Sequence, residues 1–240
     1  MTTITPKTPE EIQNLRHACK TASSLLTSLS PLIKPHATTS SIDSSASALV
    51  TSLGYTSAPL NYGGVGMTES NSGATLCSLT HNLVHALIST LHYPSWFHPW
   101  RTHGFYGGIP FCGFPKSTCI SVNDVVCHGV PSNEEVLQEG DLVNVDITVI
   151  VGGGWHGDTS RMWIVGRAWD MLEGVDLDEG GGEEGITGRE AGRVRLSVVT
   201  REAMFVGISN CREGGKVGDI GRSIQVRLEE ERRMAGAKRH

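Results

Sequence analysis

A mixed α and β fold is predicted from two kinds of pattern in the sequence. Residues 8–11 combine a hydroxyl N-cap, a proline and a glutamate, which is typical of a helix that begins with a capping box. Apolar and polar residues alternate on either side of a glycine turn within 143–165, which predicts a β-hairpin. Two further helices are expected over residues 42–53 and 198–209.

The first helix should have a buried side. Five apolar residues recur after Pro9 at helical spacing, so one face of this helix is expected to pack against the rest of the fold. These residues are Ile12, Leu15, Cys19, Ala22 and Leu26.

Composition excludes several classes of protein. With 240 residues, of which 38% are hydrophobic, the chain can bury a sizeable core. The net charge of −5 gives no electrostatic footprint for a nucleic acid. No apolar run approaches the roughly 18 residues that span a bilayer. The six cysteines form no CxxC pair and are interpreted as reduced thiols, so a cytoplasmic protein is expected, with an organelle left open.

The hairpin carries the residues of greatest chemical interest. Alternate positions from Val143 to Val151 are apolar and β-branched, whereas Asp146 and Thr148 lie on the polar face between them. A turn centred near Gly153 would place Thr148 opposite Asp158, with Asp146 diagonal to Asp158. Two carboxylates on one face repel each other unless a positive charge lies between them. A divalent metal ion is the simplest explanation, because such ions favour carboxylate ligands.

Each of these residues also has an ordinary structural interpretation. Paired aspartates on a hairpin are commonly solvated, and a lone histidine such as His128 is commonly an ordinary polar residue. The order of three motifs favours a functional site instead: VCHGVP at 126–131, GDLVNVD at 140–146 and HGDTSRM at 156–162. In this order and content the chain resembles the type I methionine aminopeptidases, densely over 114–166 and more thinly over 4–62 and 196–225.

The resemblance implies a fold and an activity. The fold is the α+β pita-bread fold, here its first half and the start of its second, with a long irregular insertion. A weak internal repeat, between segments 32–43 and 210–221, agrees with two related halves. The implied activity is metal-dependent removal of the N-terminal methionine from nascent proteins, with a preference for a small second residue. Xaa-Pro dipeptidases share this fold, but the CHGVP and HGDTSRM motifs point away from them.

The resemblance also implies roles for particular residues. Asp146 and Asp158 correspond to two metal ligands, and His128 to a histidine that contacts the substrate and assists the chemistry. Cys119, Phe114 and Tyr62 correspond to positions that line the methionine pocket. The implied cofactors are divalent ions (Co, Mn, Fe or Zn), two in a complete site. The implied partner is the N-terminal methionine of nascent polypeptides, with contact to the ribosome left open and neither nucleic-acid specificity nor a membrane expected.

Some segments depart from the family pattern within a catalytic domain expected over 1–225. Residues 63–112 match nothing in the family and are expected to displace Tyr62 from Phe114. An acidic glycine-rich loop is expected at 170–192, and the tail at 226–240 is unmatched. The family's remaining ligands, a histidine and two glutamates, have no counterpart. The chain as written is therefore expected to be C-terminally incomplete and inactive. Alternatively, it is a non-catalytic pita-bread fragment that acts as a binding module.

Overall fold

The computed structural model describes residues 5–62, 113–167 and 189–237, with side chains to residue 234. These residues divide into two compact units. Of the described residues, the first unit contains 5–32, 37–62, 113–136 and 144–161, and the second contains 33–36, 137–143, 162–167 and 189–237. No helix in the described ranges is both long enough and apolar enough to cross a membrane.

Two helices of the first unit begin with side-chain caps. Helix α1 (Pro9–Ser28) has the predicted capping box, because Thr8 Oγ1 accepts from Glu11 N and Glu11 Oε2 accepts from Thr8 N. A 3-10 turn, η1 (Ser30–Leu32), follows. Helix α2 (Thr39–Ser52) begins three residues before the expected start at 42, because Thr38 caps it through the backbone N–H of Ser41.

The buried face of α1 matches the predicted one only in part. Ala22 and Leu26 are buried as predicted, and Ala18 is buried as well, but Cys19 is exposed and Ile12 is 40% exposed. The reason is a close contact between backbones, since a Cβ at Gly157 would lie 2.1 Å from the Ala18 carbonyl oxygen. The alanine side of α1 therefore faces the sheet, and the prediction for Ile12 and Cys19 was wrong.

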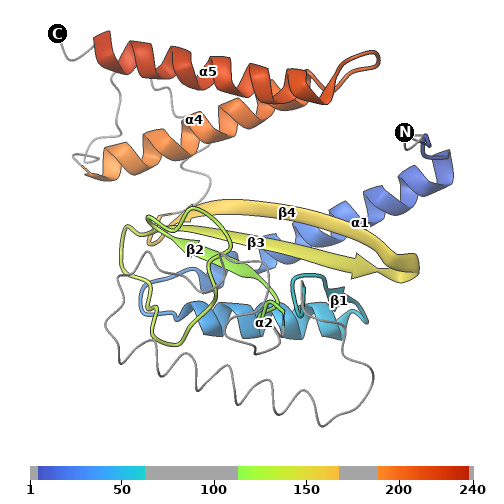
Figure 1. Ribbon diagram of the computed structural model, residues 1–240. Coiled ribbons are helices and arrows are strands. Elements are labelled where there is room, and N and C mark those ends of the chain that lie inside the picture. The colour runs from blue at the N-terminus through green and yellow to red at the C-terminus, as the bar shows by residue number, and fades with distance from the viewer. Residues whose placement is uncertain (1–4, 63–112, 168–188, 238–240) are drawn as a thin grey trace, which may run out of the picture. The chain divides into compact units, whose positions relative to one another are not determined.

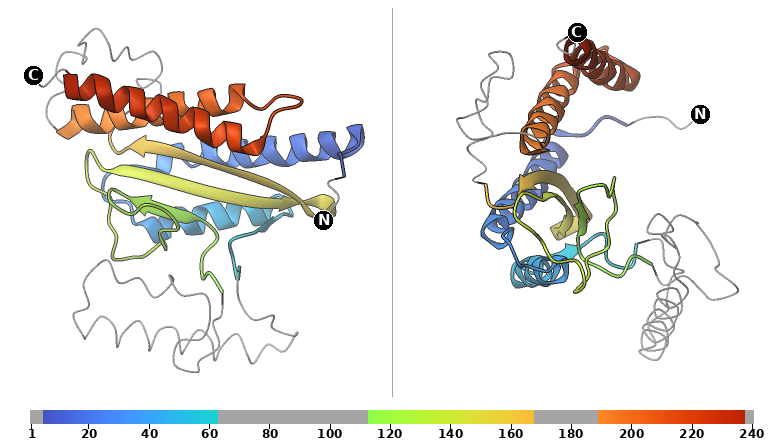
Figure 2. Two further views of the ribbon diagram at one scale, coloured as in Figure 1. Left: turned by 45° about the horizontal axis from the view of Figure 1, so that its top comes forward. Right: turned by 90° about the vertical axis from the view of Figure 1, so that its left-hand side faces the viewer.

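The sheet has four strands built around β3. Strand β1 (Thr56–Ser57), β2 (Cys119–Val122) and β4 (Trp155–Ile164) all pair with β3 (Leu142–Val151). Strand β1 runs antiparallel to β3, with Thr56 opposite Ile150. The turn η3 (Gly152–Gly154) joins β3 to β4. Figures 1 and 2 show α1 and α2 on the same side of this sheet.

The alternation predicted for β3 is confirmed. Its polar members, including Asp146 and Thr148, are half-buried on the opposite face from its apolar ones. The buried apolar residues of the strand are Val143, Val145, Ile147, Val149 and Val151.

The two ends of segment 63–112 meet. Asn61 N donates to Phe114 O at 2.8 Å, and Phe114 N donates to Tyr62 O at 2.9 Å. Two residues therefore oppose one, as in a β-bulge, and Asn61 takes the left-handed conformation (φ 66°) that such a bulge uses. The insertion does not displace Tyr62 from Phe114 at the backbone, contrary to expectation. Residues 63–112 themselves lie outside the described ranges.

The second unit contains two helices that lie side by side, α4 (Arg189–Ser209) and α5 (Val217–Ala237) (Figures 1 and 2). Helix α4 starts well before the expected residue 198. Residues 189–192, expected in a loop, are its first turn, and 170–188 are not described. Helix α5 continues through 226–237. A small core here contains Leu142, Ile164, Val194 and Val198, with Met162 packed against it.

Candidate metal and substrate site

Asp146 and Asp158 lie close together on the β3–β4 hairpin. The hydroxyl of Thr148 donates to Asp158 Oδ1 at 3.1 Å, which agrees with the predicted pairing of these two residues across the hairpin. Asp146 is half-buried and Asp158 is exposed. The two carboxyl groups are themselves within hydrogen-bonding reach of each other.

The environment of Asp146 disfavours its charged form. Burial raises the pKa of Asp146, and the nearby charge of Asp158 raises it further. The electrostatic interaction with His128 opposes this effect and lowers the pKa of Asp146. A hydrogen bond between the two carboxyl groups also raises this pKa. The pair is therefore a site of concentrated negative charge that a cation would stabilise.

These two carboxylates can form only part of a metal site. Within the described ranges, no group of three or more histidine, cysteine, aspartate or glutamate side chains gathers closely enough to hold a metal ion. Hard oxygen donors, one of them half-buried, suit a divalent cation such as Mn²⁺. The residues present thus fit a metal as a two-carboxylate part of its coordination shell.

His128 is held beside this pair in an unusual backbone conformation. Its φ is 56°, a left-handed value that is uncommon outside glycine and is often found at functional sites. The next residue, Gly129, fixes it on β2, because Ile120 N donates to Gly129 O at 2.9 Å and Gly129 N donates to Ser121 Oγ at 3.2 Å. A Cβ at Gly129 would lie only 2.0 Å from Ile120 O. This close contact explains why the CHG motif has a glycine at position 129. In the same way, the contact with Ala18 explains the glycine of the HGD motif, Gly157.

Cys119 is a buried neutral thiol next to the same group of residues. Burial, followed by the negative charge of Asp146, raises its pKa to about 12. Cys127, Asp43 and Asp158 add smaller effects in the same direction. A thiol with this pKa is protonated at neutral pH, so Cys119 is suited to line an apolar pocket rather than to bind a metal or act as a nucleophile.

The other two predicted pocket residues lie at the bulge. Phe114 is half-buried, whereas the side chain of Tyr62 is 77% exposed. Their backbones are paired, but within the described ranges no hydrogen bond joins Tyr62 to either carboxylate. The structure therefore brings Asp146, Asp158, His128 and Cys119 together and places Tyr62 and Phe114 side by side.

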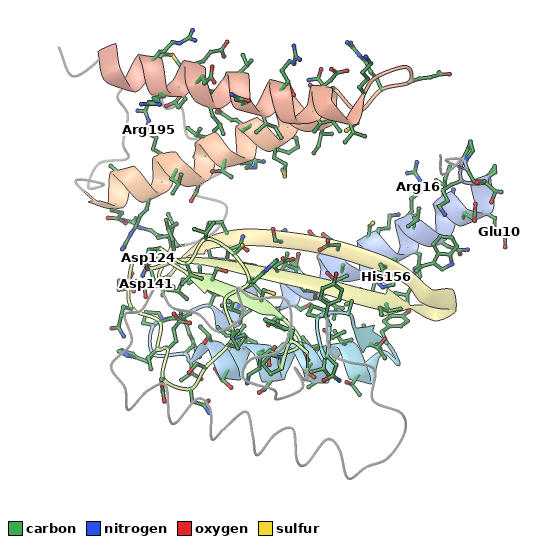
Figure 3. The ribbon with its side chains drawn as sticks, in the orientation of Figure 1. Glu10, Arg16, Asp124, Asp141, His156 and Arg195 are labelled. Atoms are coloured by element: carbon green, nitrogen blue, oxygen red, sulfur yellow. The ribbon has the colours of Figure 1, made fainter. Side chains whose placement is uncertain are left out.

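The histidine of the HGDTSRM motif does not join the carboxylate pair. Figure 3 shows His156 on β4 near the turn, and its Nδ1 lies 2.9 Å from the carbonyl oxygen of Gly154. This contact is local to the turn, so His156 helps to shape the end of the hairpin.

Sequence reasoning did not identify Asp43 as a site residue. This buried carboxylate of α2 accepts hydrogen bonds on Oδ1 from Ser117 N, Thr118 N and Thr118 Oγ1, each at 2.9 Å. It thus holds the segment that leads directly into Cys119. The sequence did contain one indication of this role, because Asp43 is an acidic residue directly after the apolar Ile42 of α2.

Paired carboxylates that need a cation are the kind of site on which metal-dependent hydrolases are built. The sequence model of metallopeptidase family M24 matches residues 100–240, and the chain belongs to this family. The match includes residues 226–240, in which the sequence alone showed no resemblance.

Relatives of known function are methionine aminopeptidases. Methionine aminopeptidase A of Synechocystis is 31% identical over 227 residues, which is 95% of this chain and 62% of the relative. The enzyme of Rickettsia prowazekii is 44% identical over 117 residues, or 49% of this chain and 36% of the relative. The chain spans about 60% of the length of the first of these and of the Escherichia coli enzyme.

Solved structures show the same fold. The crystal structure of the Rickettsia prowazekii methionine aminopeptidase matches with a TM-score of 0.62 and 31% identity, covering 95% of this chain and 63% of that one. The Thermotoga maritima structure matches with a TM-score of 0.61 at 24% identity, covering 95% and 63%. The chain therefore has the predicted α+β pita-bread fold.

Proposed function

We propose that this chain carries part of the active site of an enzyme that removes the N-terminal methionine from polypeptides. The observation on which this rests most is the pair of Asp146 and Asp158, which the β3–β4 hairpin brings together with His128 nearby. Burial, followed by the charge of Asp158, raises the pKa of Asp146. The similarity to methionine aminopeptidases over 95% of the chain supports the reaction class. Removal of methionine from nascent proteins, in the cytoplasm or near the ribosome, stays a prediction.

In this proposal Asp146 and Asp158 are the metal ligands of the described part of the chain. A divalent metal, when bound, would polarise the scissile carbonyl and lower the pKa of a bound water. His128 would donate a hydrogen bond to the substrate next to the scissile bond, since it lies beside Asp146 in a fixed conformation. Neither the identity nor the number of metal ions is specified by two carboxylates.

The methionine side chain would contact Cys119, Phe114 and Tyr62. Both a neutral buried thiol and aromatic rings suit a thioether, which is polarisable and binds well against rings and sulfur. We further propose that the second residue of the substrate must be small, as the resemblance implies.

The isolated 240-residue chain is expected to be inactive, because the described ranges gather only two carboxylates and no third metal-binding side chain. Two ligands hold Mn²⁺ or Co²⁺ weakly without a rigid cage. The purified chain should release no methionine from a Met-Ala-Ser peptide with either metal added. Release that Asp158→Ala abolishes would contradict this expectation.

A chimera tests whether the residues present are competent. Residues 63–112 are replaced by a short turn, and residues 226–240 by the C-terminal part of a methionine aminopeptidase relative. This protein should release methionine, and His128→Ala in it should lower turnover with little loss of metal. A folded, metal-loaded chimera without activity would favour the alternative of a non-catalytic binding module.

A further inference from the structure

Thr148 is in direct contact with one of the two carboxylates. It follows Asp146 by two positions on β3, so both side chains point to the same face of the sheet. Its Oγ1 lies 3.1 Å from Asp158 Oδ1. An ionised carboxylate can only accept hydrogen bonds, so the threonine hydroxyl is the donor.

The backbone of Thr148 is held by pairing of β3 with the chain at the end of β1. Its carbonyl oxygen accepts from Ala58 N at 2.9 Å, directly after the register pair of Ser57 with Val149. Its neighbours Ile147 and Val149 are buried in the core. The branched side chain of threonine has few χ1 rotamers, so the hydroxyl is held in position before any ligand binds.

Asp158 is exposed on β4, unlike the half-buried Asp146. Within the described ranges, its carboxyl group interacts with Thr148 and Asp146. Repulsion from Asp146 would turn this carboxylate away when both groups are ionised. The hydrogen bond from Thr148 opposes that rotation by holding Oδ1 in place.

We propose that Thr148 is a positioning residue that holds Asp158 in the orientation needed to bind a divalent metal ion together with Asp146. This inference rests on the proposed function, because it takes the two carboxylates as metal ligands. With Oδ1 held by the hydroxyl, Oδ2 and the remaining lone pair of Oδ1 are available to the metal. Groups that hydrogen-bond to metal ligands in this way typically change metal affinity by about 10- to 100-fold.

The test measures Mn²⁺ binding to the full 240-residue chain by the loss of the free-ion electron paramagnetic resonance signal. Thr148→Val keeps the shape and the β propensity but removes the hydroxyl, and should weaken binding by about tenfold or more. Thr148→Ser restores a hydroxyl and should return the dissociation constant to within about threefold of the original. Thr159→Val is the matched control, since Thr159 follows Asp158 on β4 with its side chain on the opposite face, and should leave the affinity unchanged.

The possible failures can be told apart. If Asp158→Ala weakens Mn²⁺ binding but Thr148→Val binds as tightly as the original chain, the positioning role is overturned while the metal site stands. If the original chain takes up no Mn²⁺, or binds it equally well without Asp146 and Asp158, both the metal site and the role of Thr148 are overturned. Equal thermal unfolding midpoints for the Val and Ser variants establish that a difference in affinity is not a difference in folding.

Discussion

Close backbone contacts require glycine at Gly129, next to His128, and at Gly157, next to Asp158. We expect Gly129→Ala to destabilise the chain by more than about 2 kcal/mol, because its Cβ would lie 2.0 Å from the backbone oxygen of Ile120. Gly152→Ala is the control, since a Cβ there meets nothing within 4 Å. Urea unfolding measures both free energies, and equal values would contradict the tight contact seen at Gly129.

Asp43 is expected to stabilise the segment before β2 through the oxygen that accepts three hydrogen bonds. Asp43→Ala leaves two buried backbone N–H groups and a buried hydroxyl unsatisfied, so a loss of at least about 2 kcal/mol is predicted. Asp43→Asn keeps an accepting oxygen and should lose less than half as much. Thermal unfolding compares the variants, and an equal loss in both would show that the charge, and not the acceptor, matters.

Local residue patterns predicted some of these features and not others. The Ala18–Gly157 contact and the hydrogen bonds of Asp43 join residues more than 70 positions apart, and no local pattern encodes such contacts. By contrast, the capping box at Thr8 lies within one turn of chain and was predictable. The close approach of Asp146 and Asp158 was also predictable, because a two-residue period and a glycine turn determine hairpin register.

At the scale of single elements, the α4–α5 pair depends on an ionic cluster. Glu231 lies on α5 and pairs with Arg195 of α4 and with Arg227 one turn earlier. Burial alone would raise the pKa of Glu231, but hydrogen bonds from Arg227 and Arg195 outweigh it and leave the pKa below its ordinary value of 4.5. Arg227 also pairs with Glu202 of α4.

This cluster should make the stability of the helix pair depend on pH. A glutamate whose pKa is lowered by folding stabilises the folded state above pH 4.5, and this stabilisation is lost as the pH falls through the lowered value. Urea unfolding between pH 7 and pH 3 should therefore show a fall at acid pH that is smaller in Glu231→Gln. Glu229→Gln, at an exposed glutamate, is the control and should keep the original profile. Parallel profiles for all three proteins would rule out this role for Glu231.

At the scale of the whole molecule, the residues that flank segment 63–112 on its two sides are joined by backbone hydrogen bonds. Because Asn61 and Tyr62 are hydrogen-bonded to Phe114, folding must bring together two points of the chain that are about fifty residues apart. Replacing the segment by a two-residue turn should keep the fold and raise the free energy of unfolding by about 3 kcal/mol, from the lower loop-closure entropy alone. Denaturant unfolding measures this change, and a protein that no longer folds would show that the segment supplies part of the core.

The pita-bread fold was recognisable from three short motifs, but the sequence did not reveal how the chain continues between them. The motifs carry the hairpin, the CHG turn and their glycines, whose spacing is set by local geometry. The early start of α4 at Arg189 and the continuation of α5 past residue 226 follow no strong local signal. The first turns of α4 are stabilised by packing of this helix on Leu142 and Ile164.

The central claim is that Asp146 and Asp158 together bind a divalent metal ion. Anomalous diffraction at the manganese edge, from crystals of the chain grown with MnCl₂, tests it most directly. The account predicts a peak between the two carboxyl groups, with an oxygen of each within about 2–2.5 Å. This peak should be absent from Asp158→Ala crystals. No peak at this position in well-ordered crystals, or a peak that survives the loss of Asp158, would contradict the metal assignment.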